Sequence, residues 1–260
     1  MCMSTTTDLD SLAPLAAHLR ALHRPGDPLV LVNVWDVASA REVAAAGAAA
    51  LGTSSAAIAA SLGLPDDNTS DPETVFSAIR RIATGAAVPV TADLERGYGL
   101  DGAALVDGLL AAGAVGCNVE DSHHRRPGEL IDADTQAEYL AGVRDAARRR
   151  GVHIVLNARI DVLLHQPDAD PASLFDQVLR RARRYLEAGA DCVYPIRLVV
   201  PALVERLATE LGAPVNANLG PTTTVRDMAT AGASRISIGP MAHRQVMADL
   251  GRRAHDLLNR

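Results

Sequence analysis

Two carboxylates stand two residues apart in the stretch V-P-V-T-A-D-L-E-R-G-Y-G, residues 88–99. The stretch begins with small apolar and β-branched residues, which favour a buried strand. Side chains alternate between the faces of a strand, so we expect Asp93 and Glu95 on one face and Val90 and Ala92 on the other. Unpaired carboxylates at the end of a buried strand are costly, and a cation is their natural partner. Solvated acids in an exposed turn are the alternative that this motif leaves open.

Polar residues follow the same pattern at the ends of other predicted strands. The candidates are Ser54, Ser55, Asp93, Glu95, Glu120, Arg159, Asn216 and Asn218. Where parallel strands form a barrel, their carboxyl ends meet at one mouth, and chemistry is found there. A chance origin suffices for any one of these residues, but not for all of them together.

Three acids and an arginine at one mouth indicate a divalent cation beside a small anionic substrate. Oxygen ligands without a nearby cluster of cysteine and histidine favour Mg²⁺, with Mn²⁺ as a substitute, over Zn²⁺. Arg159 would offer the bidentate fork that a carboxylate or phosphonate requires. The alternative is a salt bridge from Arg159 to Glu120 or Asp161 that only closes the barrel.

The elements that must position these residues alternate between short apolar strands and helices. An amphipathic helix is expected first, over residues 8–23. The expected strands are 29–34, 48–53, 88–93, 115–120, 153–158, 191–196, 214–218 and 235–239. The helices that follow them are expected over 37–46, 73–84, 101–112, 133–150, 171–188, 199–211 and 222–231, and from 241 onward. A loop is expected over 62–72, and Asp71 and Pro72 are typical of the start of the next helix.

Four junctions between a helix and the next strand share one sequence pattern, which reads A-A-G-A-A, A-A-G-A-V, E-A-G-A-D and T-A-G-A-S. Each glycine is expected to end a helix in a left-handed conformation just before the next strand. Eight strand–helix units in 260 residues predict an α/β fold, a (β/α)8 TIM barrel that forms a single domain over 1–260 with an N-terminal helix. An open doubly wound sheet is the alternative, but no G-x-G-x-x-G motif follows the first strand.

Composition narrows the classes of partner. A formal net charge of −6 argues against a nucleic acid or an anionic membrane as partner. Cys2, Cys117 and Cys192 are odd in number and widely spaced, which predicts a reduced, cytoplasmic protein without a disulfide framework. The N-terminal segment lacks the basic and apolar regions of a signal peptide, and no uncharged apolar stretch is long enough to span a bilayer.

Several motifs together resemble those of the isocitrate lyase/phosphoenolpyruvate mutase superfamily. They are T-S-S, L-G-L-P-D-D-N, D-L-E-R-G-Y-G, N-V-E-D-S and N-A-R-I-D, which follow in the family's order between about residues 29 and 245. The resemblance implies a (β/α)8 barrel, often assembled as a tetramer, in which Mg²⁺ binds an α-oxo or α-hydroxy acid. It also implies that Asp93 is the direct Mg²⁺ ligand and that Glu95 and Glu120 reach the ion directly or through water. Asp66 matches a mobile-loop residue that contributes to the metal shell or to catalysis.

The same resemblance assigns the substrate contacts. Arg159 matches the arginine that binds the substrate carboxylate, and Ser54 and Ser55 match the segment that holds it with backbone N–H groups and hydroxyls. Asn218, at the end of its strand, is expected to contact the substrate as well. His123 stands where the lyases carry their gating loop, so it is a candidate for the catalytic acid, although an exposed loop residue is the alternative.

Two departures from the family bear on the reaction. The lyase sequence K-[KR]-C-G-H and the mutase sequence E-D-K-x-F-P-K-x-N-S are both replaced by E-D-S-H-H-R-R-P-G-E. We expect a Mg²⁺-dependent lyase that acts on a small 2-oxo or 2-hydroxy carboxylate through a metal-bound enolate, by C–C cleavage or decarboxylation. The alternatives are a phosphonopyruvate-type hydrolase or mutase and a 2-oxo acid-binding barrel without catalysis. A homo-oligomer, dimer or tetramer, is expected in each case.

Overall fold

Nine short strands form the inner wall of a barrel in this computed structural model, which describes residues 9–126 and 128–259. The strands are β1 Leu29–Leu31, β2 Asn33–Val34, β3 Leu51–Thr53, β4 Val90–Asp93, β5 Gly116–Glu120, β6 Val155–Ile160, β7 Cys192–Pro195, β8 Asn216–Ala217 and β9 Arg235–Ser237. Each ladder between these described strands is parallel. Parallel strands with helical crossovers are what the sequence pattern predicts.

The barrel closes through the first predicted strand. Strands β2 to β7 form one sheet in chain order, and β1, β9 and β8 form a second sheet. The predicted strand 29–34 is interrupted at Val32, so that β1 pairs with β9 and β2 pairs with β3. A parallel bridge between Val193 and Val215 joins the remaining edges. The two sheets therefore make up the (β/α)8 barrel predicted from the sequence.

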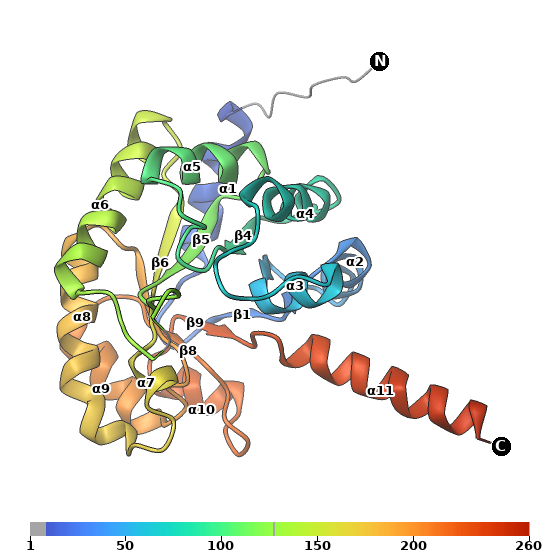
Figure 1. Ribbon diagram of the computed structural model, residues 1–260. Helices are drawn as coiled ribbons and strands as arrows, with labels where there is room; N and C mark the ends of the chain where they lie inside the picture. The colour runs from blue at the N-terminus through green and yellow to red at the C-terminus, as the bar shows by residue number, and fades with distance from the viewer. Residues whose placement is uncertain (1–8, 127, 260) are drawn as a thin grey trace.

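Helices surround this barrel (Figure 1). They are α1 Leu9–Ala21, α2 Val37–Ala45, α3 Ser55–Leu62, α4 Pro72–Thr84, α5 Gly102–Ala111, α6 Ala133–Arg149, α7 Val162–His165, α8 Phe175–Glu187, α9 Pro201–Leu211, α10 Val225–Thr230 and α11 Met241–Leu258, with a 3₁₀ turn η1 at Pro171–Leu174. The sequence did not predict α3 or α7, and the helix expected from residue 171 begins as η1. The predicted start of α4 is confirmed, since the Asp71 side chain accepts a hydrogen bond from the Thr74 N–H at 3.1 Å and Pro72 follows.

The four predicted glycine junctions are confirmed. Gly47, Gly113, Gly189 and Gly232 have φ angles of 93°, 80°, 98° and 80°, in the left-handed region that glycine adopts without steric cost. Each glycine follows a helix and lets the chain turn sharply into the next strand. The glycines therefore keep the connections short at the amino ends of the strands.

Helix α1 covers the amino ends of the central strands. The Arg20 side chain donates to the carbonyl oxygen of Ile154 at 3.1 Å, and it pairs with Asp191 just before β7. Arg144 of α6 pairs with the other carboxylate oxygen of Asp191. Leu19, fully buried, lies against Gly116 at the start of β5. The polar strand ends therefore face the opposite end of the barrel.

Helix α11 departs from the usual barrel plan. All of its 18 residues lie in the described part of the chain, and none of them is buried. It projects away from the ring of helices rather than packing along it (Figure 1). Within the described residues, no helix is long and apolar enough to cross a membrane.

Candidate active site

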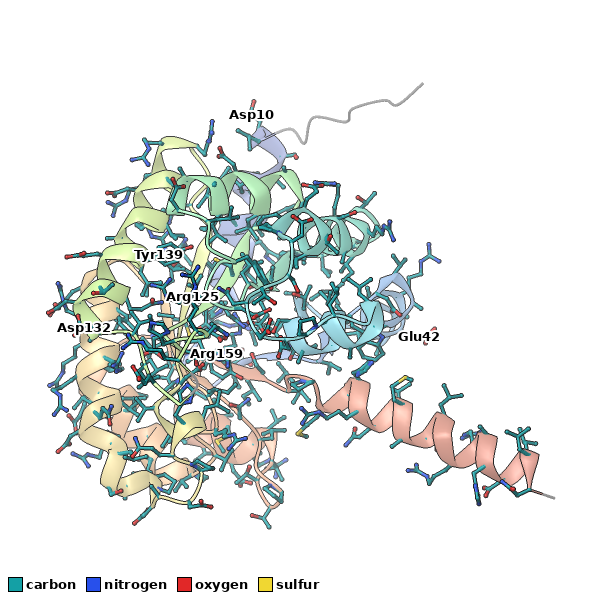
Figure 2. All side chains as sticks on the ribbon, in the orientation of Figure 1. Asp10, Glu42, Arg125, Asp132, Tyr139 and Arg159 are labelled. Atoms are coloured by element: carbon teal, nitrogen blue, oxygen red, sulfur yellow. The ribbon has the colours of Figure 1, made fainter. Side chains whose placement is uncertain are left out.

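Two adjoining cavities open at the carboxyl ends of the strands, with volumes of about 350 Å³ and about 310 Å³. The first is lined by Asn118, Tyr194 and Asn218 among others, and the second by Glu95, Glu120 and the loop histidines. Four residues line both: Ser55, Asp66, Arg159 and Leu164. Figure 2 shows Arg159 inside the ring of helices, whereas Asp132 lies on its outer side. The structure thus gathers the predicted polar residues at one mouth, except for Asn216, which is buried, donates to the Ser237 hydroxyl and lines neither cavity.

Asp93 ends β4 and faces the first cavity. Its Oδ2 accepts a hydrogen bond from the Ser55 hydroxyl at 3.0 Å, and its backbone N–H donates to Thr53 Oγ1 at 3.0 Å. Its Oδ1 is buried and has no hydrogen-bond partner among the described residues. A buried carboxylate oxygen without a partner is costly, so this atom marks a place for a ligand or an ion.

The position of Glu95 differs from the prediction that Asp93 and Glu95 lie on one face of a strand. Strand β4 ends at Asp93, and Glu95 lies in the following turn with a left-handed φ of 47°, so it lines the second cavity rather than the first. Burial raises the pKa of Glu95 to about 8, and the charges of Asp66, Glu120 and Asp93 add to this effect. The carboxylates of Asp93 and Glu95 are therefore close enough to repel each other, although they line different cavities.

Asn68 fixes the loop that carries Asp66. Its backbone N–H donates to the Glu95 carboxylate, and its side-chain oxygen accepts from the N–H groups of Arg96 at 3.2 Å and Tyr98 at 2.7 Å. Asn68 has a φ of 61°, a conformation that asparagine tolerates better than most residues. The loop therefore holds Asp66 between the cavities, where partial burial and Asp93 raise the pKa of Asp66.

Arg159 is held by two carboxylates. Its Nε donates to Asp161 Oδ1 at 2.7 Å, its Nη2 donates to Asp161 Oδ2 at 3.1 Å, and its Nη1 pairs with Glu120 Oε2. The salt bridges considered from the sequence are therefore both present. Burial raises the pKa of Glu120, although Arg159 acts in the opposite direction. A substrate carboxylate would have to share this guanidinium with Glu120.

The histidines of the 122–126 segment line the second cavity. His124 Nε2 lies 2.8 Å from Glu120 Oε1, and His123 Nδ1 is buried with no hydrogen-bond partner among the described residues. His165 also lines this cavity, and its Nε2 lies 2.8 Å from the Ser122 hydroxyl. The half-buried His123 therefore lines the second cavity, and its role as a proton donor stays a prediction.

The two serines begin a helix that the sequence did not predict. The Ser54 hydroxyl accepts the N–H of Ala57 at 3.4 Å as the N-cap of α3, and Ser55 is the first helical residue. The helix N-terminus, with Ala56, opens on the first cavity. Because the N-terminus of a helix carries partial positive charge, it suits a carboxylate.

Asn218 lines the first cavity, but its amide is bound by the protein. It contacts the Tyr194 hydroxyl, the Ser237 carbonyl oxygen and the Arg197 N–H at 2.9, 2.7 and 2.9 Å. Its predicted contact with a substrate stays a prediction. Tyr194 itself was missed, although its place at the end of a short apolar strand matches the signal that found the other site residues.

The acidic residues are of the chemical type that binds a divalent cation, but their arrangement in this structure suits one less well. Among the residues that the structure describes, no group of three or more histidine, cysteine, aspartate or glutamate side chains is arranged to hold a metal ion. A cation would nevertheless pair with the unpartnered oxygen of Asp93. It would also offset the repulsion that, together with the larger effect of burial, raises the pKa of Glu95. The assignment of Asp93, Glu95 and Glu120 as ligands stays a prediction.

A closed (β/α)8 barrel with carboxylates and a buried arginine at its carboxyl mouth defines a TIM-barrel protein with its candidate active site at that mouth. A family model described as phosphoenolpyruvate phosphomutase matches residues 19–258. An uncharacterised protein of Mycobacterium tuberculosis (strain H37Rv) is 31% identical over 227 residues, which cover 85% of this chain and 81% of that protein. The 2-methylisocitrate lyase of Escherichia coli K12 is 28% identical over 219 residues, 76% of this chain and 71% of the enzyme.

Solved structures agree with this match. A proposed phosphonomutase from Burkholderia cenocepacia J2315 has a TM-score of 0.87 at 40% identity, over 94% of this chain and 99% of that one. A 2,3-dimethylmalate lyase has a TM-score of 0.82 at 25% identity, over 95% and 87% of the two chains. This chain belongs to the isocitrate lyase/phosphoenolpyruvate mutase superfamily.

Proposed function

We propose that the protein is a Mg²⁺-dependent lyase that cleaves a carbon–carbon bond of a small 2-oxo or 2-hydroxy carboxylate, or decarboxylates it. One observation carries the proposal: Asp66, Asp93, Glu95 and Glu120 gather where two cavities adjoin, and the arginine beside them is buried. Such a site suits a cation and a carboxylate side by side. Relatives named as carbon–carbon lyases support the reaction class.

The cofactor would be held mainly by Asp93. Glu95 and Glu120 would reach it directly or through water, and Mn²⁺ would substitute for Mg²⁺ because both prefer oxygen ligands. When bound, the metal supplies a Lewis acid that stabilises negative charge on a substrate oxygen. The unpartnered Asp93 Oδ1 is the atom of this set most ready to bind it.

The substrate carboxylate would lie in the first cavity, between Arg159 and the N-terminus of α3. Arg159 supplies a charge that cannot be lost at physiological pH, and the first turn of α3 supplies the backbone N–H of Ala56, while the N–H of Ser55 donates to Asp93 Oδ2 at 3.4 Å. The Ser55 hydroxyl, which donates to Asp93, ties this anion site to the acidic cluster.

Two residues would move protons. The hydroxyl proton of a 2-hydroxy substrate passes to Asp66, which lines both cavities and whose pKa is raised by partial burial. The carbon–carbon bond then breaks, and its electron pair passes into the carboxylate of the departing fragment. A proton from His123, in the second cavity, completes that fragment.

The proposal is tested by pyruvate release from oxaloacetate, 2-methylisocitrate, 2,3-dimethylmalate and phosphonopyruvate, each with Mg²⁺. We expect one of the first three acids to be cleaved, and Asp93→Ala to lose at least a hundredfold in turnover. Asp168→Ala, at an exposed carboxylate in the α7–η1 loop, should keep full activity. Full turnover by Asp93→Ala would contradict the proposed site.

A second candidate is a phosphonopyruvate-type hydrolase or mutase. Its support is the proposed phosphonomutase that is 40% identical to this chain, together with Arg197 and Arg244, two further cations at the first cavity. Phosphate release from phosphonopyruvate, or its conversion to phosphoenolpyruvate, would favour this candidate over the lyase. Binding of these acids without any turnover would instead favour a barrel that only binds 2-oxo acids.

We also propose that the protein is a homo-oligomer in which α11 packs on a second copy. Val246, Met247, Leu250 and Leu257 are all exposed, and their spacing places them along one side of α11. Six large apolar side chains of this helix are exposed in all: Met241, Val246, Met247, Leu250, Leu257 and Leu258. A stripe of this kind needs a partner.

The barrel has a place to receive that helix. In a (β/α)8 barrel the last helix packs beside the first strand and the first barrel helix. A cavity of about 570 Å³ lies there, lined by Leu29 and Val30 of β1 and by Val43 and Ala46 of α2. Exchange of α11 between two copies would fill it in both.

Light scattering after size-exclusion chromatography tests the assembly. We expect a dimer or tetramer for the wild type and a smaller species for Leu250→Glu, because the new charge falls on the apolar stripe. Gln245→Glu adds the same charge on another face of α11 and should leave the assembly unchanged. A monomeric wild type would overturn this part of the proposal.

A further inference from the structure

The orientation of the Asn218 amide is fixed from both sides by backbone groups. Its Oδ1 accepts the N–H of Arg197 at 2.9 Å, and its Nδ2 donates to the carbonyl oxygen of Ser237 at 2.7 Å. A backbone N–H cannot accept and a carbonyl oxygen cannot donate, so the amide cannot be turned over. The second N–H of the same Nδ2 therefore points to the Tyr194 hydroxyl, 2.9 Å away.

This contact decides where the Tyr194 proton points. The Tyr194 oxygen accepts from Asn218, so its own proton must be directed elsewhere. Arg159, its neighbour on β6, offers no acceptor. Among the described residues the hydroxyl has no other hydrogen-bond partner, and the side chain, 4% exposed, lines the first cavity. Burial raises the pKa of Tyr194 to about 12 against the opposing effect of Arg159, so the hydroxyl keeps its proton at neutral pH.

A backbone outlier supports this positioning. Arg197 has a left-handed φ of 70°, which is unfavourable for a residue with a side chain. The conformation is held by the hydrogen bond from the Arg197 N–H to Asn218, the residue that also orients Tyr194. The chain thus retains a strained turn at the point where it fixes the direction of one hydroxyl proton.

Asn118 presents a second donor to the same cavity by the same logic. Its Oδ1 accepts from Asn157 Nδ2 at 2.8 Å and from Arg235 Nη2 at 3.1 Å, so its own Nδ2 is left for the cavity that it lines. Arg235 is 1% exposed and forms no ion pair with a described residue. The positive charge of Arg235 therefore lies beneath one wall of the first cavity. That wall offers two oriented donors, the O–H of Tyr194 and the N–H of Asn118.

We propose that the Tyr194 hydroxyl binds the substrate by donating a hydrogen bond to an oxygen of its anionic group, with Asn118 as a second donor. Because both side chains are oriented as donors, they select a ligand that presents only hydrogen-bond acceptors, such as a carboxylate or an enolate oxygen. Asn218 acts as a positioning residue for Tyr194. The proposed function supplies only the kind of ligand, a small carboxylate.

Oxalate binding in the presence of Mg²⁺, measured by titration calorimetry, tests the proposal without any turnover. We expect Tyr194→Phe to bind oxalate at least tenfold more weakly than the wild type, because it keeps the ring but lacks the hydroxyl that accepts from Asn218 and donates to the ligand. Tyr139→Phe is the matched control: its hydroxyl donates to the Leu100 carbonyl oxygen at 3.0 Å and lines neither cavity, so its affinity should stay within twofold.

A double-mutant cycle with Asn218→Asp tests the orientation itself. A carboxylate at 218 would accept the Tyr194 proton and turn it away from the ligand. We therefore expect Asn218→Asp to weaken oxalate binding in the wild type by more than it does in the Tyr194→Phe background, where only charge repulsion remains. Equal effects in the two backgrounds, or wild-type affinity in Tyr194→Phe, would overturn the proposal.

The test of the donor role of Tyr194 can be distinguished from the test of the proposed lyase reaction. A wild type that binds oxalate but cleaves none of the four acids refutes the lyase, while Tyr194→Phe still decides the donor role. A wild type that binds neither oxalate nor any of the four acids overturns the donor role as well.

Discussion

His23 should make this fold unstable in mild acid. It follows α1 at the amino end of the barrel, is 9% exposed, and its Nδ1 lies 2.9 Å from the Leu19 carbonyl oxygen, while its Nε2 is buried without a partner among the described residues. Burial lowers the pKa of His23 from 6.5 to about 4, and the neighbouring Arg235 adds to this effect. The folded protein therefore excludes a proton that the unfolded chain readily binds.

The sign and size of the effect follow from proton linkage. A histidine with a depressed folded pKa contributes stability above its unfolded pKa of 6.5, and this contribution is lost as the pH falls towards about 4. Because a tenfold difference in proton affinity corresponds to about 1.4 kcal/mol, the full loss is about 3 kcal/mol. Between pH 7 and pH 5, where only part of the titration occurs, the loss is about 2 kcal/mol.

Urea unfolding of the wild type and of His23→Gln at pH 7 and pH 5 measures this loss. Other groups titrate in the same range, so the quantity that matters is the difference between the two proteins. We expect the wild type to lose about 2 kcal/mol more than His23→Gln, and His255→Gln, at an exposed position on α11, to behave as the wild type. Equal losses in wild type and His23→Gln would show that His23 is not excluded from protonation in the fold.

Four further substitutions test the packing of the fold and the loop that carries Asp66. Gly102→Ala would place a Cβ 2.6 Å from the backbone of α6, so it should lower the free energy of unfolding by about 1–3 kcal/mol. The Cβ of Gly142→Ala would meet nothing within 4 Å, so this substitution should raise the free energy of unfolding by up to about 1 kcal/mol. Urea unfolding measures both changes. Asp191→Asn leaves two arginines without their carboxylate, so we expect a loss of about 3 kcal/mol in the same assay, and a loss below about 1 kcal/mol would contradict the importance of this clamp. Asn68→Gly keeps the left-handed backbone but removes the side-chain acceptor, so we expect faster proteolysis near Asn68 and a fall in turnover with little change in melting temperature; an unchanged proteolysis rate would refute the role of that side chain.

The sequence predicted the barrel well because its signals are local and repeated. Short apolar strands, amphipathic helices and four glycine junctions each follow from spacing along the chain, and all are present in the structure. Helix α3 was missed because S-A-A-I-A-A-S-L consists mainly of alanine and serine and shows no clear apolar periodicity, while its cap, Ser54, had been considered only as a ligand-binding residue. The loose position of α11 could not be predicted, since an amphipathic stripe does not say which surface will cover it.

The site was predicted less completely than the fold, for a different physical reason. Alternation along a strand placed Asp93 and Arg159 at the mouth, but it failed at Glu95, where the strand had already ended and the backbone turned left-handed. Pairing between distant segments is also invisible in one sequence. The contacts of Asn68 with the turn after β4, and of Asn218 with Tyr194, join residues 24 to 30 positions apart.

Residue type alone does not locate the ligand in this site, because most of the polar groups already have protein partners. Arg159 is shared by two carboxylates, Ser55 donates to Asp93, and the amide of Asn218 is fully used. The groups left over include one oxygen of Asp93, the Nδ1 of His123, the Nδ2 of Asn118 and the proton of Tyr194. A buried polar group without a partner is costly, and within a binding site a ligand that pairs with the group removes this cost. A cation at Asp93 and an oxyanion at Tyr194, as proposed above, would satisfy two of these groups within one cavity, and a metal-dependent reaction of a small carboxylate requires that arrangement.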